Sequence, residues 1–128
     1  MPSFKDDIKS AKIFYNSWRT RVTFSPALEC NIRISLLGWN HITGSTGHKK
    51  RSIKDKHRRL NLLSIAEQFI LKSTTIQNIT TKNNKKYFAL EAVMNVDFNG
   101  KSSFRKVRVI ILEAKNGDKI FYSVMDKK

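Results

Sequence analysis

Two kinds of hydrophobic periodicity divide the chain. Apolar residues recur at helical spacing over residues 4–18 and again from Ser52 to about Lys72, which predicts two amphipathic helices. After residue 74 the period changes to two, as in a strand with one buried face. The alternation is cleanest over residues 86–98, where one side of the strand carries Phe88, Leu90, Ala92, Met94, Val96 and Phe98.

Turn-forming residues indicate how the strands connect. Asn99-Gly100 and Asn116-Gly117 are typical of tight hairpins, so strands near residues 103–113 and 119–125 should pair antiparallel with their neighbours. We therefore expect an α+β fold, with an N-terminal helix and one long amphipathic helix packed on an antiparallel, roughly four-stranded meander sheet. The 128 residues suit a single domain, with residues 1–30 as a helical N-terminal extension and 31–126 as the core.

The segment between the two helices is less regular. Residues 30–35 alternate apolar and polar side chains, as a short strand does. Residues 38–48 contain three glycines, which favours a loop. Ser52 can then cap the second helix, with Asp55 at the third helical position in a variant of the capping box.

The charge balance points to a polyanionic partner. The chain has 25 Lys and Arg against 10 Asp and Glu, a formal net charge of +15. At 40% hydrophobic residues it is too apolar for a disordered basic tail. Binding a polyanion lowers the electrostatic repulsion within a folded protein of this net charge. Nucleic acid is the leading candidate for that polyanion.

The sequence lacks the features of disulfide-bonded, exported and membrane-spanning proteins. Cys30 is the only cysteine, so an internal disulfide and a CxxC metal knuckle are excluded. The N-terminal residues do not form the pattern of a signal peptide, and no apolar run approaches the length of a membrane span. We therefore expect a soluble, cytoplasmic protein that makes no membrane contact.

A basic block precedes and enters the second predicted helix. Residues 49–59 contain seven Lys or Arg and one Asp. Cations in the first turns of a helix oppose its macrodipole, at a place where the backbone N–H groups attract an anion. This block therefore predicts a phosphate site, with the nucleic-acid-binding candidates His48, Lys49, Lys50, Arg51 and Arg59.

A second basic zone is spread over the predicted sheet. Lys106 and Arg108 are two residues apart, so they should project from the same face of a strand and bind a nucleic-acid backbone. Three aromatic residues are candidate base-stacking surfaces, although each also suits ordinary packing: Trp39, Tyr87 and Tyr122.

The three histidines, His41, His48 and His57, fall within seventeen residues and adjoin the basic block. Metal-independent RNA cleavage needs a base for the 2′-hydroxyl, an acid for the leaving 5′-oxygen and cations for the charged transition state. The histidines can supply the first two and the block can supply the third. This pattern predicts an endoribonuclease that forms a 2′,3′-cyclic phosphate and needs no cofactor.

Two other functions fit the same sequence. A non-catalytic RNA- or DNA-binding module has the same charge and needs no histidine. A Mg²⁺-dependent DNA nuclease would use Asp97, Glu113 and Lys115, in an arrangement of acidic residues followed by Glu-x-Lys. The spacing of the three histidines matches no zinc site, so no other metal is predicted.

Short motifs also resemble a known nuclease family. They are Ile-Arg-Ile-Ser from Ile32, Gly-Trp-Asn-His-Ile from Gly38, Lys-His-Arg-Arg-Leu from Lys56 and Phe-Tyr-Ser-Val from Phe121. In layout and motifs, residues 31–126 resemble the phage-associated branch of the barnase/EndoU/colicin/RelE-like (BECR-fold) nucleases. The resemblance implies a metal-independent, toxin-like ribonuclease, with RNA (tRNA among the candidates) as substrate and an acidic immunity protein or antitoxin as partner.

The resemblance also implies a set of catalytic residues. Family members place histidine or basic residues near the first helix and often a Ser or Thr on the last strand. The matching positions here are His41, the group Lys54, His57 and Arg58, and Ser123, which would hydrogen-bond the scissile phosphate.

Overall fold

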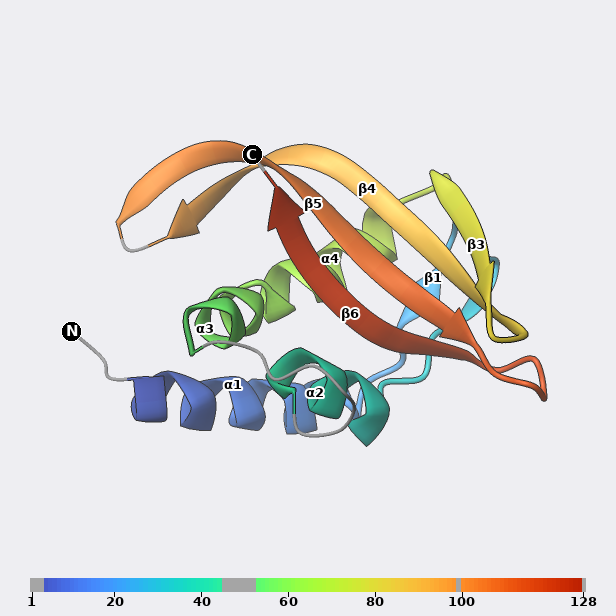
Figure 1. Ribbon diagram of the computed structural model, residues 1–128, viewed down its shortest axis with the longest axis horizontal. Coiled ribbons are helices and arrows are strands. Elements are labelled where there is room, and N and C mark those ends of the chain that lie inside the picture. Colours follow the sequence, from blue (N-terminus) through green and yellow to red (C-terminus); the bar gives the residue numbers. More distant parts are fainter. Residues whose placement is uncertain (1–3, 45–52, 99, 128) are drawn as a thin grey trace.

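The computed structural model describes residues 4–44, 53–98 and 100–127 (Figure 1). Four helices are α1 (Phe4–Trp18), α2 (Leu36–Thr43), α3 (Ile53–Asn61) and α4 (Leu63–Lys72). A four-stranded antiparallel sheet has the order β3 (Asn78–Lys82), β4 (Lys85–Phe98), β5 (Lys101–Glu113) and β6 (Lys119–Lys127). A small second sheet pairs β1 (Phe24–Ser25) with β2 (Cys30–Asn31). The fold is broadly α+β, as predicted.

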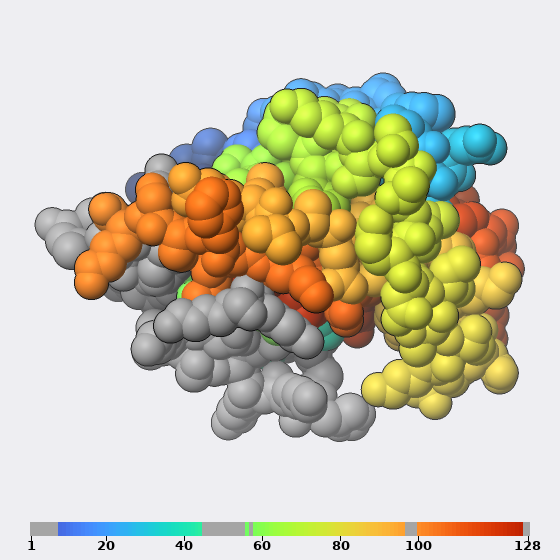
Figure 2. Space-filling model, turned by 90° about the horizontal axis from the view of Figure 1, so that it is seen from above, coloured from blue at the N-terminus to red at the C-terminus, as the bar shows by residue number. Residues whose placement is uncertain are grey.

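Tight turns set the register of the large sheet. Strands β3 and β4 are joined at Asn83 and Asn84, which have φ values of 52° and 63°, and Asn tolerates such positive values in hairpin turns. Strand β5 pairs with β4 from the Phe98–Lys101 end to the Lys86–Glu113 end. Seen from above, the β4–β5 turn and the β3–β4 turn therefore lie at opposite ends of the sheet (Figure 2).

The face of the sheet toward the helices, here called the inner face, forms the core. Phe88 and Leu90 lie on it, as the alternation predicted. Helix α1 adds Tyr15 and Trp18 to the same core, both fully buried. Helices α3 and α4 lie against this face and α2 lies beside β6 (Figure 1), so the opposite side is the outer face. In the described ranges, none of the helices is both long and apolar enough to cross a bilayer.

The prediction of a loop over residues 38–48 is wrong for residues 38–43, which belong to α2. The hydroxyl of Ser35 accepts a hydrogen bond from the Leu37 N–H at the start of this helix, and Gly44 ends it at a φ of 71°. Gly38 serves packing: a Cβ there would lie 2.6 Å from the Phe121 carbonyl oxygen and 2.7 Å from the Tyr15 hydroxyl. The rest of the expected loop, residues 45–48, lies outside the described residues.

Two other elements are shorter than predicted. The alternation over residues 30–35 gives only β2 and a single parallel bridge between Arg33 and Ile120. The helix expected from residue 52 to 72 is divided into α3 and α4 at Leu62. Leu62, between the two helices, and Leu63, the first residue of α4, are both buried.

Replacing Gly38 with alanine should destabilise the protein. In an exposed helix the change would be favourable by up to about 1 kcal/mol, but here the added methyl group meets the backbone of β6, and overpacking costs about 1–3 kcal/mol. Urea unfolding of Gly38→Ala checks this, with Leu36→Ala at an exposed position of α2 as the control. Equal or greater stability of Gly38→Ala would contradict the close packing of α2 on β6.

Candidate nucleic-acid interface

Strand β6 contains one more residue than the part of β5 that it faces. Ile110 pairs with Ser123, whereas the next residue, Ile111, pairs with Phe121. Tyr122 is therefore the extra residue of a β-bulge. Phe121 and Ser123 are both buried, whereas Tyr122 is half-buried.

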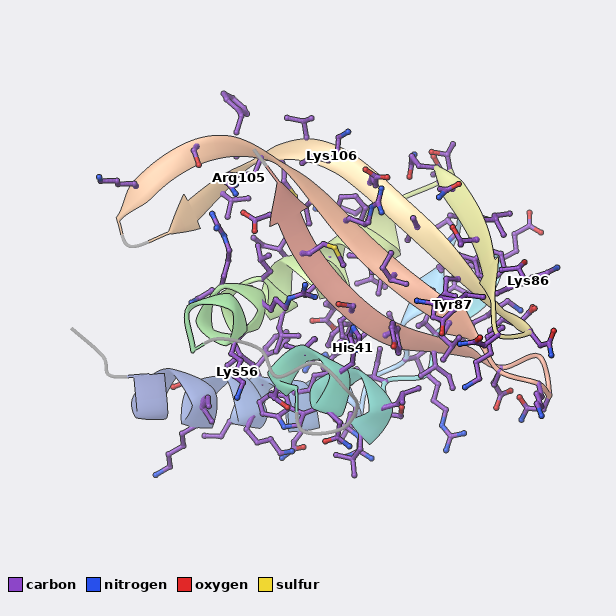
Figure 3. The ribbon with its side chains drawn as sticks, viewed as in Figure 1. His41, Lys56, Lys86, Tyr87, Arg105 and Lys106 are labelled. Carbon is purple, nitrogen blue, oxygen red and sulfur yellow. The ribbon has the colours of Figure 1, made fainter. Side chains whose placement is uncertain are left out.

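The bulge brings Tyr122 to two other rings on the outer face. The rings of His41 and Tyr122 stack with their centroids 4.0 Å apart. On the other side, Tyr87 meets Tyr122 edge to face at 5.4 Å. These three half-buried side chains, here called the outer aromatic row, come from α2, β6 and β4; Figure 3 labels His41 and Tyr87. The structure thus joins two of the three predicted stacking residues to a predicted catalytic histidine.

Trp39, the third predicted stacking residue, does not belong to this row. Its ring is buried and lies 5.6 Å from the ring of Tyr15. The Lys12 ammonium covers it at 4.5 Å from the ring centroid. Trp39 therefore serves the core and is not a base-stacking surface.

Cations continue the outer face beyond the outer aromatic row. The Arg108 guanidinium lies 2.7 Å from one Glu91 carboxylate oxygen, and the Lys106 ammonium lies 3.9 Å from the other. The two cations thus share one carboxylate and keep a net positive charge. Arg105 and Lys106 are adjacent and project to opposite sides of β5 (Figure 3). Lys106 and Arg108, two residues apart, therefore lie on the same face, as predicted.

The register of the sheet places like charges opposite each other. Lys82 pairs with Lys85 across the β3–β4 turn. Like charges directly opposite in a sheet are destabilising. An anionic ligand relieves this repulsion, so these positions favour binding of a polyanion.

Arg58 and Arg59, from the basic block, point to the inner side of the sheet. A terminal nitrogen of Arg59 donates to the Ser123 hydroxyl at 2.7 Å. Arg58 and Arg105 hold opposite oxygens of Asp126 at 2.9 and 2.7 Å, and the Asp126 side chain is only 4% exposed. These groups fasten α3 to the sheet. Ser123 is 1% exposed in this structure, and its contact with a scissile phosphate stays a prediction.

The break at Leu62 also changes the helix-dipole argument. Because α3 ends at Asn61, Arg58 and Arg59 lie in its last turn, where the macrodipole favours cations. The prediction that these two arginines oppose the dipole is therefore wrong. Only the earlier cations of α3, such as Lys54, occupy its first turn.

The remaining predicted residues fall largely outside the described part. His48, Lys49, Lys50 and Arg51 lie in residues 45–52, which the structure does not describe. Lys54 and His57 belong to α3, but only their backbone is described. His41 is thus the one predicted histidine whose side chain the structure describes.

The alternative magnesium site is divided between the two ends of the β4–β5 hairpin. Asp97 is in register with Ser102, whereas Glu113 is in register with Lys86. Eleven residues of strand separate these positions, which is about 36 Å, so one cation cannot bind both. Lys119 hydrogen-bonds the carboxylate of Glu113 at 2.8 Å and lowers its pKa.

A cavity of about 650 Å³ lies at the end of α1, away from the outer aromatic row. Three arginines line it, and each already has a partner: Arg21 pairs with Glu67 at 2.8 Å, Arg33 lies 3.7 Å from Asp118, and Arg19 donates to the Ile34 carbonyl at 3.3 Å. No residue of the outer face contributes to it.

No family model matches the chain, and neither the curated proteins nor the solved structures include a match to it. The resemblance to the BECR-fold nucleases stays a prediction.

Replacing Asp126 with asparagine should destabilise the protein strongly. The change leaves two guanidinium groups at the inner face without their shared carboxylate, and removing one partner of a buried ion pair costs about 3–5 kcal/mol. Urea unfolding measures the loss. The control is Asp118→Asn, whose carboxylate is 48% exposed and should change stability by less than about 1 kcal/mol. Similar small effects at both positions would show that Asp126 does not fasten α3.

Proposed function

We propose that the protein binds single-stranded RNA on the outer face of its sheet. The observation that carries the proposal is the outer aromatic row, His41, Tyr122 and Tyr87, beside the cations of β5. Bases stack on aromatic rings, and basic side chains hold the phosphates that connect them. The net charge of +15 supplies the long-range attraction.

The geometry favours unpaired bases over a duplex. Rings on an open sheet can offer their faces or edges only to bases that are not already stacked between neighbours in a helix. Binding that accepts many base sequences depends on base stacking and on contacts between cations and phosphates together. Unpaired bases are common in RNA loops, bulges and ends, which is why RNA is the ligand that we propose.

Tyr87→Ala should weaken binding of a single-stranded RNA 12-mer by about five- to 150-fold, since one stacked base contributes about 1–3 kcal/mol. Fluorescence anisotropy at fixed salt measures the affinity. Tyr87→Phe keeps the ring and should bind like the unaltered protein.

Phe24→Ala serves as the matched control for this experiment. Phe24 is an aromatic residue 48% exposed on β1, away from the outer face. Equal losses for Tyr87→Ala and Phe24→Ala, or no loss for either, would contradict binding at the outer aromatic row. Tighter binding of duplex than of single-stranded RNA would contradict the preference for unpaired bases.

A second candidate function is metal-independent RNA cleavage on the same face. The specific observation that favours it is His41 in the outer aromatic row, where an imidazole would lie close to a bound strand. Such a group can take the 2′-hydroxyl proton, and a cation of the same face, such as Arg108, can stabilise the charged phosphorane. A toxin-like role, with tRNA as substrate and an acidic immunity protein or antitoxin as partner, belongs to this candidate.

If the protein cleaves RNA, cleavage should continue in EDTA and leave 2′,3′-cyclic phosphate ends. His41→Ala should then reduce the rate by about 100-fold or more, the usual contribution of a general acid or base. His41→Phe separates the two functions, because it keeps a ring for stacking and removes the titratable nitrogens. Cleavage that requires Mg²⁺, or that persists in His41→Phe, would contradict this mechanism.

A further inference from the structure

The outer face exposes a further aromatic side chain, Phe104, at the end away from the outer aromatic row. Phe104 is 75% exposed and Val93 is 66% exposed on the β4–β5 hairpin. Phe104 pairs with Asn95, and Val93 pairs with Lys106. These are alternate positions of the two strands, so all four residues lie on the same face as the charged pair of Arg108 with Glu91.

The surroundings of Phe104 identify the chemistry of its partner. Leaving a Phe in water forgoes about 1.5–3 kcal/mol of burial. Its neighbours on this face are the exposed Val93, the polar Asn95 opposite it and the cationic Lys106 two residues along β5. A partner must therefore offer a flat apolar surface next to negative charge, as an unpaired nucleobase with its phosphate does. A second copy of the chain is disfavoured, because each copy carries +15.

We propose that Phe104 stacks on a base of the same RNA strand that the outer aromatic row binds. This inference rests on the proposed function and adds its second contact point. Eight residues of β5 separate Phe104 from Leu112, which pairs with Tyr87, a distance of about 26 Å along the strand. Lys106 and Arg108 lie between the two ends. At the stacked rise of 3.4 Å per nucleotide, the strand between them has about eight nucleotides.

The test compares a uridine-rich RNA 4-mer with a 12-mer in fluorescence anisotropy. The 12-mer can reach both ends of the face, whereas the 4-mer can reach only one. Phe104→Ala and Phe104→Leu should weaken 12-mer binding about five- to 150-fold. Phe104→Tyr, which keeps a ring, should bind the 12-mer like the unaltered protein. Ile79→Ala is the control, since Ile79 is 54% exposed but lies on the edge strand β3.

The length dependence distinguishes the inference from the proposed function. Tyr87→Ala should weaken binding of both RNAs, whereas Phe104→Ala should reduce the advantage of the 12-mer over the 4-mer. If the unaltered protein binds RNA and Phe104→Ala binds the 12-mer equally well, the inference fails and the proposed function stands. If the unaltered protein binds neither RNA, both fail.

Self-association is measured in parallel by sedimentation equilibrium. We expect the unaltered protein and Phe104→Ala to sediment as monomers. A dimer that Phe104→Ala converts to a monomer would overturn the inference, because it would show that Phe104 binds a second copy of the chain.

Discussion

The bulge at Tyr122 determines on which face of the sheet each neighbouring side chain of β6 lies. In a regular strand, Phe121 and Ser123 would share one face with Tyr122 on the other, but Val124 would then have to leave the core. With one extra residue, Ser123 and Val124 are both buried while Tyr122 stays with the outer rings. The bulge thereby connects the packing of α3, through Arg59 and Ser123, to the outer aromatic row. Bulges often redirect a side chain at functional sites.

The strongly basic composition serves two separate purposes. On the inner face, Arg58 and Arg105 surround the buried carboxylate of Asp126 and stabilise the fold. On the outer face, Lys106 and Arg108 share Glu91, and Lys82 is in register with Lys85 between β3 and β4. Each group has two cations on one carboxylate, but the inner group is packed beneath α3, whereas Lys106 of the outer group is 54% exposed and can meet a ligand.

The sequence predicts the sheet well because a period of two reports burial of one face directly. It fails where tertiary packing decides. The Gly38 contact with β6 has no local signature, so the glycines predict a loop where α2 forms, and the apolar pattern continues through the break at Leu62. The site residues were predicted unevenly for the same reason. Tyr87 and Tyr122 carry aromatic rings on predicted strands, but no pattern indicates the bulge. The contacts of Arg58 with Asp126 and of Arg59 with Ser123 depend on how α3 packs on the sheet, which the sequence does not show.

Photocrosslinking with mass-spectrometric mapping tests the central claim most directly. A single-stranded 12-mer containing 4-thiouridine is bound to the intact protein, irradiated and digested, and the crosslinked residues are identified. Binding across the outer face predicts crosslinks at Tyr87 or Tyr122 and at Phe104, which come from three strands of one sheet. Crosslinks confined to α1 and the arginine-lined cavity at its end, or none under conditions where the RNA is bound, would contradict it.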